Sequence, residues 1–197
     1  MSDDQASADQ PESHSSVGKW DHWYQSVSPD ELGKHLYGDA TTYLMAAAFM
    51  ADIEEVEDWG CGTGGFRRFY QGKYTGLDGS QTPFADKIVD LCDYRSAVEG
   101  ILIRHVLEHN HRWDRILKSA ISSFRKKLCL VLFTPFVERT AEVAAQRPGK
   151  FDVPALSFNK QEIEKHFDGL SWRLLQDIKT QTNHGVEHVY FIWRPQG

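Results

Sequence analysis

The stretch Glu57-Asp58-Trp59-Gly60-Cys61-Gly62-Thr63-Gly64-Gly65 decides the fold of this chain. Together with Val56 it indicates a short strand that enters a glycine-rich turn. Because glycine has no Cβ atom, such a turn lets the backbone come close to a bound ligand. The N–H groups of the next helical turn, expected over residues 66–70, would face that ligand. The sequence therefore predicts a ligand-binding turn directly after the first strand.

Two carboxylates flank this turn. Gly60, Gly62 and Gly65 satisfy the dinucleotide pattern G-x-G-x-x-G. However, Asp58 lies two residues before the first glycine, where a dinucleotide-binding strand is usually apolar. A carboxylate there suits the cationic amino-acid end of a sulfonium cofactor better than a pyrophosphate. Asp78 ends the next strand, 20 residues after Asp58, and can accept hydrogen bonds from the ribose hydroxyls of either cofactor.

Strands and helices alternate along the rest of the chain. The expected strands are 56–59, 74–77, 87–89, 100–103, 128–133, 172–178 and 186–193, and the expected helices are 28–36, 40–50, 66–70, 107–124 and 159–167. Two capping boxes, at Ser28 and Asn159, open the first and last helices. The last two strands are separated by a turn, so they are expected to pair antiparallel. This order predicts an α/β fold with a doubly wound, mostly parallel, Rossmann-like sheet and an antiparallel last strand.

Composition limits the class of protein. The 197 residues are 41% hydrophobic and 12% aromatic, which is enough for one real core. Residues 1–18 are polar and acidic, so they are expected to be a disordered tail before a single domain at 19–197. A net charge of −6 disfavours partners held by bulk electrostatics, such as nucleic acid or an anionic membrane. The three cysteines have no CxxC spacing, which favours reduced thiols and a cytoplasmic protein. No apolar run approaches the roughly 20 residues of a membrane span, and no signal peptide is visible.

From its first expected helix to its last strand, the chain resembles the class I S-adenosylmethionine-dependent methyltransferases. The resemblance rests on 57–64, on Leu77-Asp78 and on His105-Val106-Leu107-Glu108-His109, which is similar to the V-L-E-H segment after strand four of many such enzymes. It implies S-adenosylmethionine as cofactor. The implied cofactor-binding residues are Asp58, Gly60, Gly62, Gly64 and Arg104 for the methionine end, Asp78 for the ribose, and Asp90 and Leu91 for the adenine. Asp93 competes with Asp90 for the last role, and Tyr24 is a candidate to close over the cofactor.

The run from Arg104 to His111 contains the candidate catalytic residues. His105 follows the apolar strand 100–103, so it should lie near the transferred methyl, and a histidine can accept a proton near neutral pH. His109 is the second candidate, whereas Glu108 is expected to satisfy backbone groups at the helix start. Some related O-methyltransferases carry E-x-x-E-H here and bind a divalent ion. This chain has His in place of the first Glu, which weakens a magnesium site, so no metal is expected, although His184 or His188 could add a ligand.

The acceptor side of the site is less defined. An aromatic wall is possible from Trp20, Trp23, Phe133 and Phe136, and the loop-rich segment 134–158 is expected to shape the acceptor site. The resulting expectation is an enzyme that methylates an oxygen of a hydroxylated small molecule or a saccharide. Such an enzyme could be a homo-oligomer or work with a partner subunit. One alternative is a nicotinamide-dependent oxidoreductase, although no Tyr-x-x-x-Lys spacing follows the fourth strand. A non-catalytic partner subunit that retains the fold is the other alternative.

Overall fold

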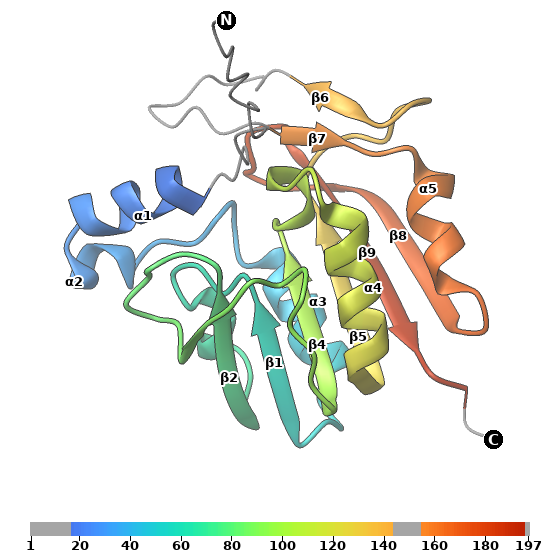
Figure 1. The fold of residues 1–197 in the computed structure, drawn as a ribbon, viewed down its shortest axis with the longest axis horizontal. Coiled ribbons are helices and arrows are strands. Elements are labelled where there is room, and N and C mark those ends of the chain that lie inside the picture. Colours follow the sequence, from blue (N-terminus) through green and yellow to red (C-terminus); the bar gives the residue numbers. More distant parts are fainter. Residues whose placement is uncertain (1–16, 144–154, 196–197) are drawn as a thin grey trace, which may run out of the picture.

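A computed structural model describes residues 17–143 and 155–195 of the chain. Within these residues one sheet has the strand order β3-β2-β1-β4-β5-β9-β8 (Figure 1). The strands are β1 (Glu55–Trp59), β2 (Lys73–Asp78), β3 (Lys87–Ile88), β4 (Val98–Arg104), β5 (Phe124–Leu132), β8 (Ser171–Lys179) and β9 (Val186–Trp193). Neighbours from β3 to β5 are parallel, and β9 is antiparallel to both β5 and β8. The predicted sheet, with its antiparallel last strand, is confirmed.

Helices cover both faces of this sheet, as a doubly wound fold requires. Successive residues of a strand face opposite sides, so Ile101 and Ile103 pack in one buried cluster and Leu102 in the other. Helix α4 (Trp113–Ser123) and helix α5 (Lys160–Glu164) pack against the first cluster, and α3 (Thr41–Phe49) packs against the second. The central strands are therefore buried on both faces, which explains their continuous apolar sequence.

Each predicted capping box forms its N-cap bond, but the carboxylate of the third helical residue bonds elsewhere: Glu31 accepts from Ser28 Oγ and Glu162 accepts from Thr140 Oγ1. Ser28 Oγ accepts a hydrogen bond from the Glu31 N–H and donates one to the Glu31 carboxylate, at the start of α2 (Pro29–Leu32). Asn159 Oδ1 accepts from the Glu162 N–H, 3.1 Å away, at the start of α5. The helix α2 is shorter than expected and stops before Gly33. Helix starts were predictable here because a cap depends only on residues three positions apart.

The single helix expected over 107–124 is divided. A 3₁₀ turn, η2 (Leu107–His109), precedes α4, and Phe124 already belongs to β5. Asn110 has an extended backbone between the two, and its Oδ1 accepts a hydrogen bond from the Arg112 N–H at 2.8 Å. Such a side-chain bond competes with helical hydrogen bonding, and it explains the break. The brief helix expected over 66–70 is likewise 3₁₀, η1 (Gly65–Arg68), and the last expected helix ends in η3 (Lys165–Phe167).

Two features were not expected. The aromatic segment forms helix α1 (Val17–Ser26), which lies beyond the carboxyl ends of the parallel strands (Figure 1). Val17 and Gly18, expected to end the disordered tail, are the first residues of this helix. Within 134–158, β6 (Ala141–Val143) and β7 (Ala155–Ser157) pair antiparallel as a separate small sheet. Residues 1–16 of the expected tail lie outside the described residues, as do 144–154. No helix of the described segments is long and apolar enough to cross a membrane.

Candidate active site

The glycine-rich turn leaves β1 with left-handed backbone angles. Gly60 has φ of +79°, and a Cβ atom there would lie 2.2 Å from Val106 Cγ2. No side chain fits at this position, because it combines a positive φ with contact to the segment after β4. The N–H groups of Gly60 and Cys61 both donate to the Leu77 carbonyl, at 2.7 and 2.9 Å, which ties the turn to the end of β2. The turn therefore lies against both neighbouring strands.

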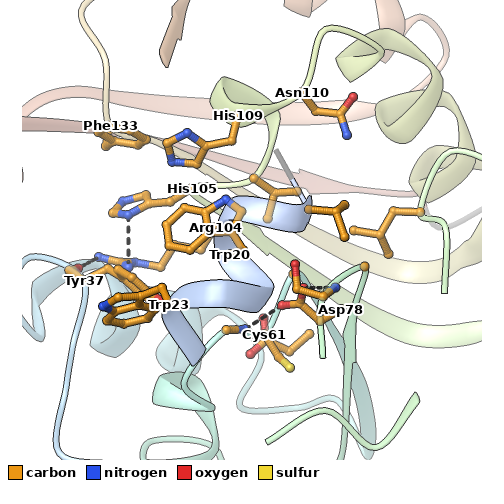
Figure 2. Close-up of a pocket in the computed structure, with 18 of the residues that line it drawn as sticks. Trp20, Trp23, Tyr37, Cys61, Asp78, Arg104, His105, His109, Asn110 and Phe133 are labelled. Atoms are coloured by element: carbon orange, nitrogen blue, oxygen red, sulfur yellow. Dashed lines mark hydrogen bonds between the residues drawn. The ribbon is translucent and has the colours of Figure 1, made fainter. Parts of the chain in front are cut away.

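Asp78 joins the same turn to the end of β2. Its Oδ2 accepts a hydrogen bond from the Gly62 N–H and its Oδ1 accepts from the Ser80 N–H, each at 2.9 Å. A carboxylate has about four acceptor positions. The two bonds thus fix the orientation of Asp78 and leave capacity for a ligand with two hydroxyls. Figure 2 shows Asp78 beside Cys61 at one end of the pocket.

Asp58 is almost completely buried at the end of β1. The hydroxyl of Tyr74 donates to its Oδ2 at 2.7 Å. Burial raises the pKa of Asp58 to about 7; the Tyr74 bond opposes this rise, and the nearby Asp78 charge adds to it. A cation placed beside Asp58 would restore its charged form. The site is therefore prepared for a positively charged group.

A cavity of about 760 Å³ lies at the carboxyl ends of the parallel strands, a size typical of small-molecule sites. Most of the predicted site residues line it: Asp58, Gly60, Gly62, Asp78, Asp90, Leu91, Arg104, His105 and His109. Gly64 does not; it supports the turn behind Gly62. Asp90 lines the cavity, whereas Asp93 pairs with Arg115 and is exposed. Of the two candidates for the adenine position, only Asp90 is at the cavity.

Arg104, which lines this cavity, forms a buried ion pair with Glu187. The guanidinium Nη2 lies 2.8 Å from Glu187 Oε1 and donates to the Tyr37 carbonyl at 2.7 Å. Its Nε donates to Thr42 Oγ1 at 3.0 Å, and the guanidinium lies 3.9 Å from the centre of the Tyr43 ring. The Arg104 and Glu187 side chains are only 3% and 0% exposed. Arg104 thus holds β4, α3 and β9 together as well as lining the cavity.

His105 is bound into the same cluster. Its Nε2 lies 2.5 Å from Glu187 Oε1, and its Nδ1 lies 3.3 Å from the Arg104 guanidinium, as the dashed line in Figure 2 marks. Burial and the Arg104 charge lower the pKa of His105 to about 4, although Glu187 opposes the change. The His105 ring is therefore neutral at pH 7, contrary to the expectation of a base that titrates near neutral pH. The backbone of His105 is also unusual, with a φ of +58°.

The expected aromatic wall is formed in part. Trp20, Trp23 and Phe133 line the cavity, and Phe136 instead stacks on His188 with ring centres 4.3 Å apart. His109 lies between Trp20 and Phe133, with ring centres 5.3 and 5.4 Å away. Figure 2 shows Phe133 and His109 on the side of the pocket away from Asp78, with Trp20 drawn between them and Asp78. The cavity thus has a carboxylate end and an aromatic end. Tyr24 lines it too, with its hydroxyl 3.1 Å from that of Tyr37.

Glu108 faces the protein interior. Its Oε1 accepts a hydrogen bond from the Phe133 N–H at 2.6 Å, so it satisfies backbone as expected, but at the end of β5. Burial raises its pKa to about 8.

The described residues contain no group of three or more His, Cys, Asp and Glu side chains arranged as metal ligands. Arg67 donates a hydrogen bond to the Asp86 carboxylate, and Arg68 donates one to the Gly33 carbonyl.

Sequence reasoning missed Glu187 and used His184 only as a possible metal ligand. Glu187 is the one carboxylate of the strand Val186–Trp193, and its place in a buried strand was the available signal, since a charge buried in a strand needs a partner. His184 and three neighbours of the β8–β9 turn line the cavity. Nothing local in the sequence brings this turn to the end of β4.

Comparison with known proteins supports the fold. No protein-family model matches the chain, and no curated protein sequence matches it. One similar structure is 1,6-didemethyltoxoflavin-N1-methyltransferase of Burkholderia thailandensis with bound 1,6-didemethyltoxoflavin and S-adenosylhomocysteine (14% identity, TM-score 0.61, 98% of this chain and 94% of that chain). Another is magnesium protoporphyrin IX methyltransferase of Synechocystis with bound S-adenosylmethionine (16% identity, TM-score 0.58, 87% of this chain and 94% of that chain).

A third similar structure is a putative methyltransferase in complex with a methyltransferase activator from Haloferax volcanii (12% identity, TM-score 0.57, 93% of this chain and 99% of that chain). Identities this low establish architecture and leave activity to be argued from the site. The strand order, the glycine turn after β1 and the carboxylate at the end of β2 agree with this architecture. The chain has the fold of the class I S-adenosylmethionine-dependent methyltransferases.

Proposed function

We propose that the protein is an S-adenosylmethionine-dependent methyltransferase that methylates oxygen on a hydroxylated small molecule. The observation that carries this proposal is that Asp58 and Asp78 line one cavity on either side of the glycine turn. Asp58 suits the ammonium of the cofactor, and Asp78 has free acceptor capacity for the ribose hydroxyls. Asp90 and Leu91 line the part of the wall where adenine would lie. When bound, the cofactor supplies an electrophilic methyl group.

The same residues disfavour a nicotinamide dinucleotide. Its pyrophosphate would carry negative charge to the glycine turn, next to the buried Asp58. Like charges that meet in a buried site raise the free energy of the complex. The chain's contribution to catalysis would be to orient the cofactor and the acceptor in this cavity, and orientation accounts for a large part of many rate enhancements. The structural relative bound to an activator makes a partner subunit a further possibility for this chain.

Cofactor binding should raise the melting temperature. A ligand at 100 times its dissociation constant adds about 2.7 kcal/mol to the free energy of unfolding, which is roughly 5–10 °C for a domain of this size. S-adenosylmethionine and S-adenosylhomocysteine should therefore both stabilise the protein in a thermal-shift assay, and NAD should not. A shift with NAD alone would instead favour the oxidoreductase alternative.

Cofactor affinity should also depend on pH through Asp58. Its pKa of about 7 leaves it mostly protonated at pH 6. A bound ammonium favours the carboxylate, so binding at pH 6 should release close to one proton, and affinity should fall as pH drops below 7. At pH 8 Asp58 is already charged, and little release is expected.

Calorimetric titration with S-adenosylhomocysteine, in buffers of different ionisation enthalpy, measures this release directly. Asp58→Asn is the control, because it should bind more weakly and lose the difference between pH 6 and pH 8. Equal proton release from wild type and Asp58→Asn would assign the linkage to another group.

A further inference from the structure

Three imidazoles surround one phenyl ring at the aromatic end of the cavity. The centre of the Phe133 ring lies 4.7 Å from that of His105, 5.4 Å from that of His109 and 5.8 Å from that of His184. All four residues line the cavity. His105 and Phe133 directly follow β4 and β5, His109 belongs to η2, and His184 belongs to the β8–β9 turn, so the tertiary structure alone brings them together. The three histidines differ in what else they contact.

His184 is the imidazole with a ring nitrogen left for a ligand. The residue is 7% exposed, and its Nε2 has no hydrogen-bond partner among the described residues. His105 differs, since Glu187 and Arg104 occupy its two nitrogens. A buried polar atom without a partner costs free energy, and this cost is removed when a ligand supplies the partner. His184 is therefore the better candidate to receive a polar group of the acceptor.

The turn that carries His184 is held in place. The Gln181 N–H donates to Asp39 Oδ2 at 3.0 Å, and the Gly185 N–H donates to the Thr182 carbonyl at 2.9 Å. Thr182 Oγ1 also donates to the Val186 carbonyl at 3.1 Å. The turn is thus fixed both internally and to the segment before α3. A ring on such a support is oriented before the ligand arrives, which lowers the entropy cost of binding.

We propose that the cavity end formed by Phe133, His109, Trp20 and His184 binds a planar aromatic acceptor whose hydroxyl hydrogen-bonds to His184 Nε2. This assignment rests on the proposed function and narrows its acceptor to a phenol. Aromatic walls match a flat ring. A saccharide needs a partner for each of several hydroxyls, whereas polar groups nearby, such as Arg104, His105 and Thr182, already bond to the protein.

The same contact provides an acceptor for the proton of the phenol hydroxyl. With S-adenosylmethionine bound, the phenol oxygen would bond to the methyl carbon while the methyl–sulfur bond breaks, and the electron pair of that bond would stay on sulfur. The hydroxyl proton passes to His184 Nε2, and the ring later returns it to solvent. Burial lowers the pKa of His184, so the imidazole is neutral and has an acceptor nitrogen at pH 7. His105 then serves to hold Glu187 and Arg104 in position.

The test measures binding, so that it does not depend on turnover. Wild-type protein is first saturated with S-adenosylhomocysteine and then titrated calorimetrically with 7-hydroxycoumarin, 4-nitrocatechol, 7-methoxycoumarin and methyl glucoside. We expect at least one phenol to bind and methyl glucoside not to bind. His184→Phe keeps a ring but removes both nitrogens; it should weaken the phenol by about tenfold or more and leave 7-methoxycoumarin within about twofold. His109→Phe is the matched variant and should change 7-hydroxycoumarin and 7-methoxycoumarin equally.

The binding results distinguish the phenol assignment from the proposed function. Binding of the sugar in preference to the phenols, equal loss of both coumarins in His184→Phe, or selective loss in His109→Phe would overturn the assignment. Binding of S-adenosylhomocysteine without binding of either phenol would overturn it and leave the proposed function standing. Absence of S-adenosylhomocysteine binding would overturn the proposed function and the assignment together. Should His184→Phe be unstable, His184→Gln keeps an acceptor oxygen and should retain part of the preference for the hydroxyl compound.

Discussion

Arg104→Met should lower the free energy of unfolding by about 3–5 kcal/mol. The substitution leaves the Glu187 carboxylate buried without its cation, and Glu187 is 0% exposed. Breaking a buried pair on one side costs more than the pair itself contributes, because the remaining Glu187 carboxylate has no water and keeps only His105 and Thr42, neither of which supplies the Arg104 charge. Methionine fills a similar volume, so the lower free energy of unfolding would come from the lost charge more than from changed packing. Urea denaturation of both proteins at pH 7 measures the difference.

Two variants serve as controls for Arg104→Met. Arg115 also pairs with a carboxylate, Asp93, but both side chains are more than half exposed. Arg115→Met should therefore cost only about 0–1 kcal/mol. Adding Glu187→Gln to Arg104→Met removes the orphaned charge and should recover most of the loss. If Arg104→Met is no more damaging than Arg115→Met, or if Glu187→Gln adds further loss, the buried pair is not what holds this part of the fold.

Asp78→Asn should weaken the binding of S-adenosylhomocysteine by roughly 10²-fold or more. Two charge-assisted hydrogen bonds to ribose hydroxyls would be lost or inverted, each of which contributes about 1.5–3 kcal/mol. The amide is close in size to the carboxylate, so the cavity keeps its shape. Its NH₂ group would, however, face one of the N–H donors of Gly62 and Ser80, so some loss of stability is expected as well. Calorimetry gives the affinity, and denaturation separates the loss of stability.

Asp93→Asn is the matched control for Asp78→Asn. It is also a carboxyl-to-amide change downstream of the glycine turn, but it lies at an exposed ion pair away from the cavity. Its affinity for S-adenosylhomocysteine should stay within about twofold of wild type, and Asp90→Asn should show a larger effect than Asp93→Asn. Affinity retained within about threefold in Asp78→Asn would mean that Asp78 supports the turn and does not bind the ribose.

Local sequence patterns predicted most of the fold. The apolar segments of β4 and β5 were found because strands buried on both faces read as continuous apolar runs. Ser28 and Asn159 were found because a capping box needs only four neighbouring residues. The break at Asn110 and the pairing of β6 with β7 were missed. Each depends on one side-chain bond or on very short strands, and neither leaves a periodic pattern.

The sequence by itself determined the carboxylate end of the site. Asp58, the glycine turn and Asp78 lie within two consecutive strands, so their spacing along the chain already dictates that they meet at one edge of the sheet. The aromatic end was decided by tertiary structure. Glu187 lies 83 residues from Arg104 and 82 from His105, and His184 enters from the β8–β9 turn. The physical reason is that burial and long-range partners set the charge and hydrogen-bonding state of a side chain, and both are properties of the packed molecule.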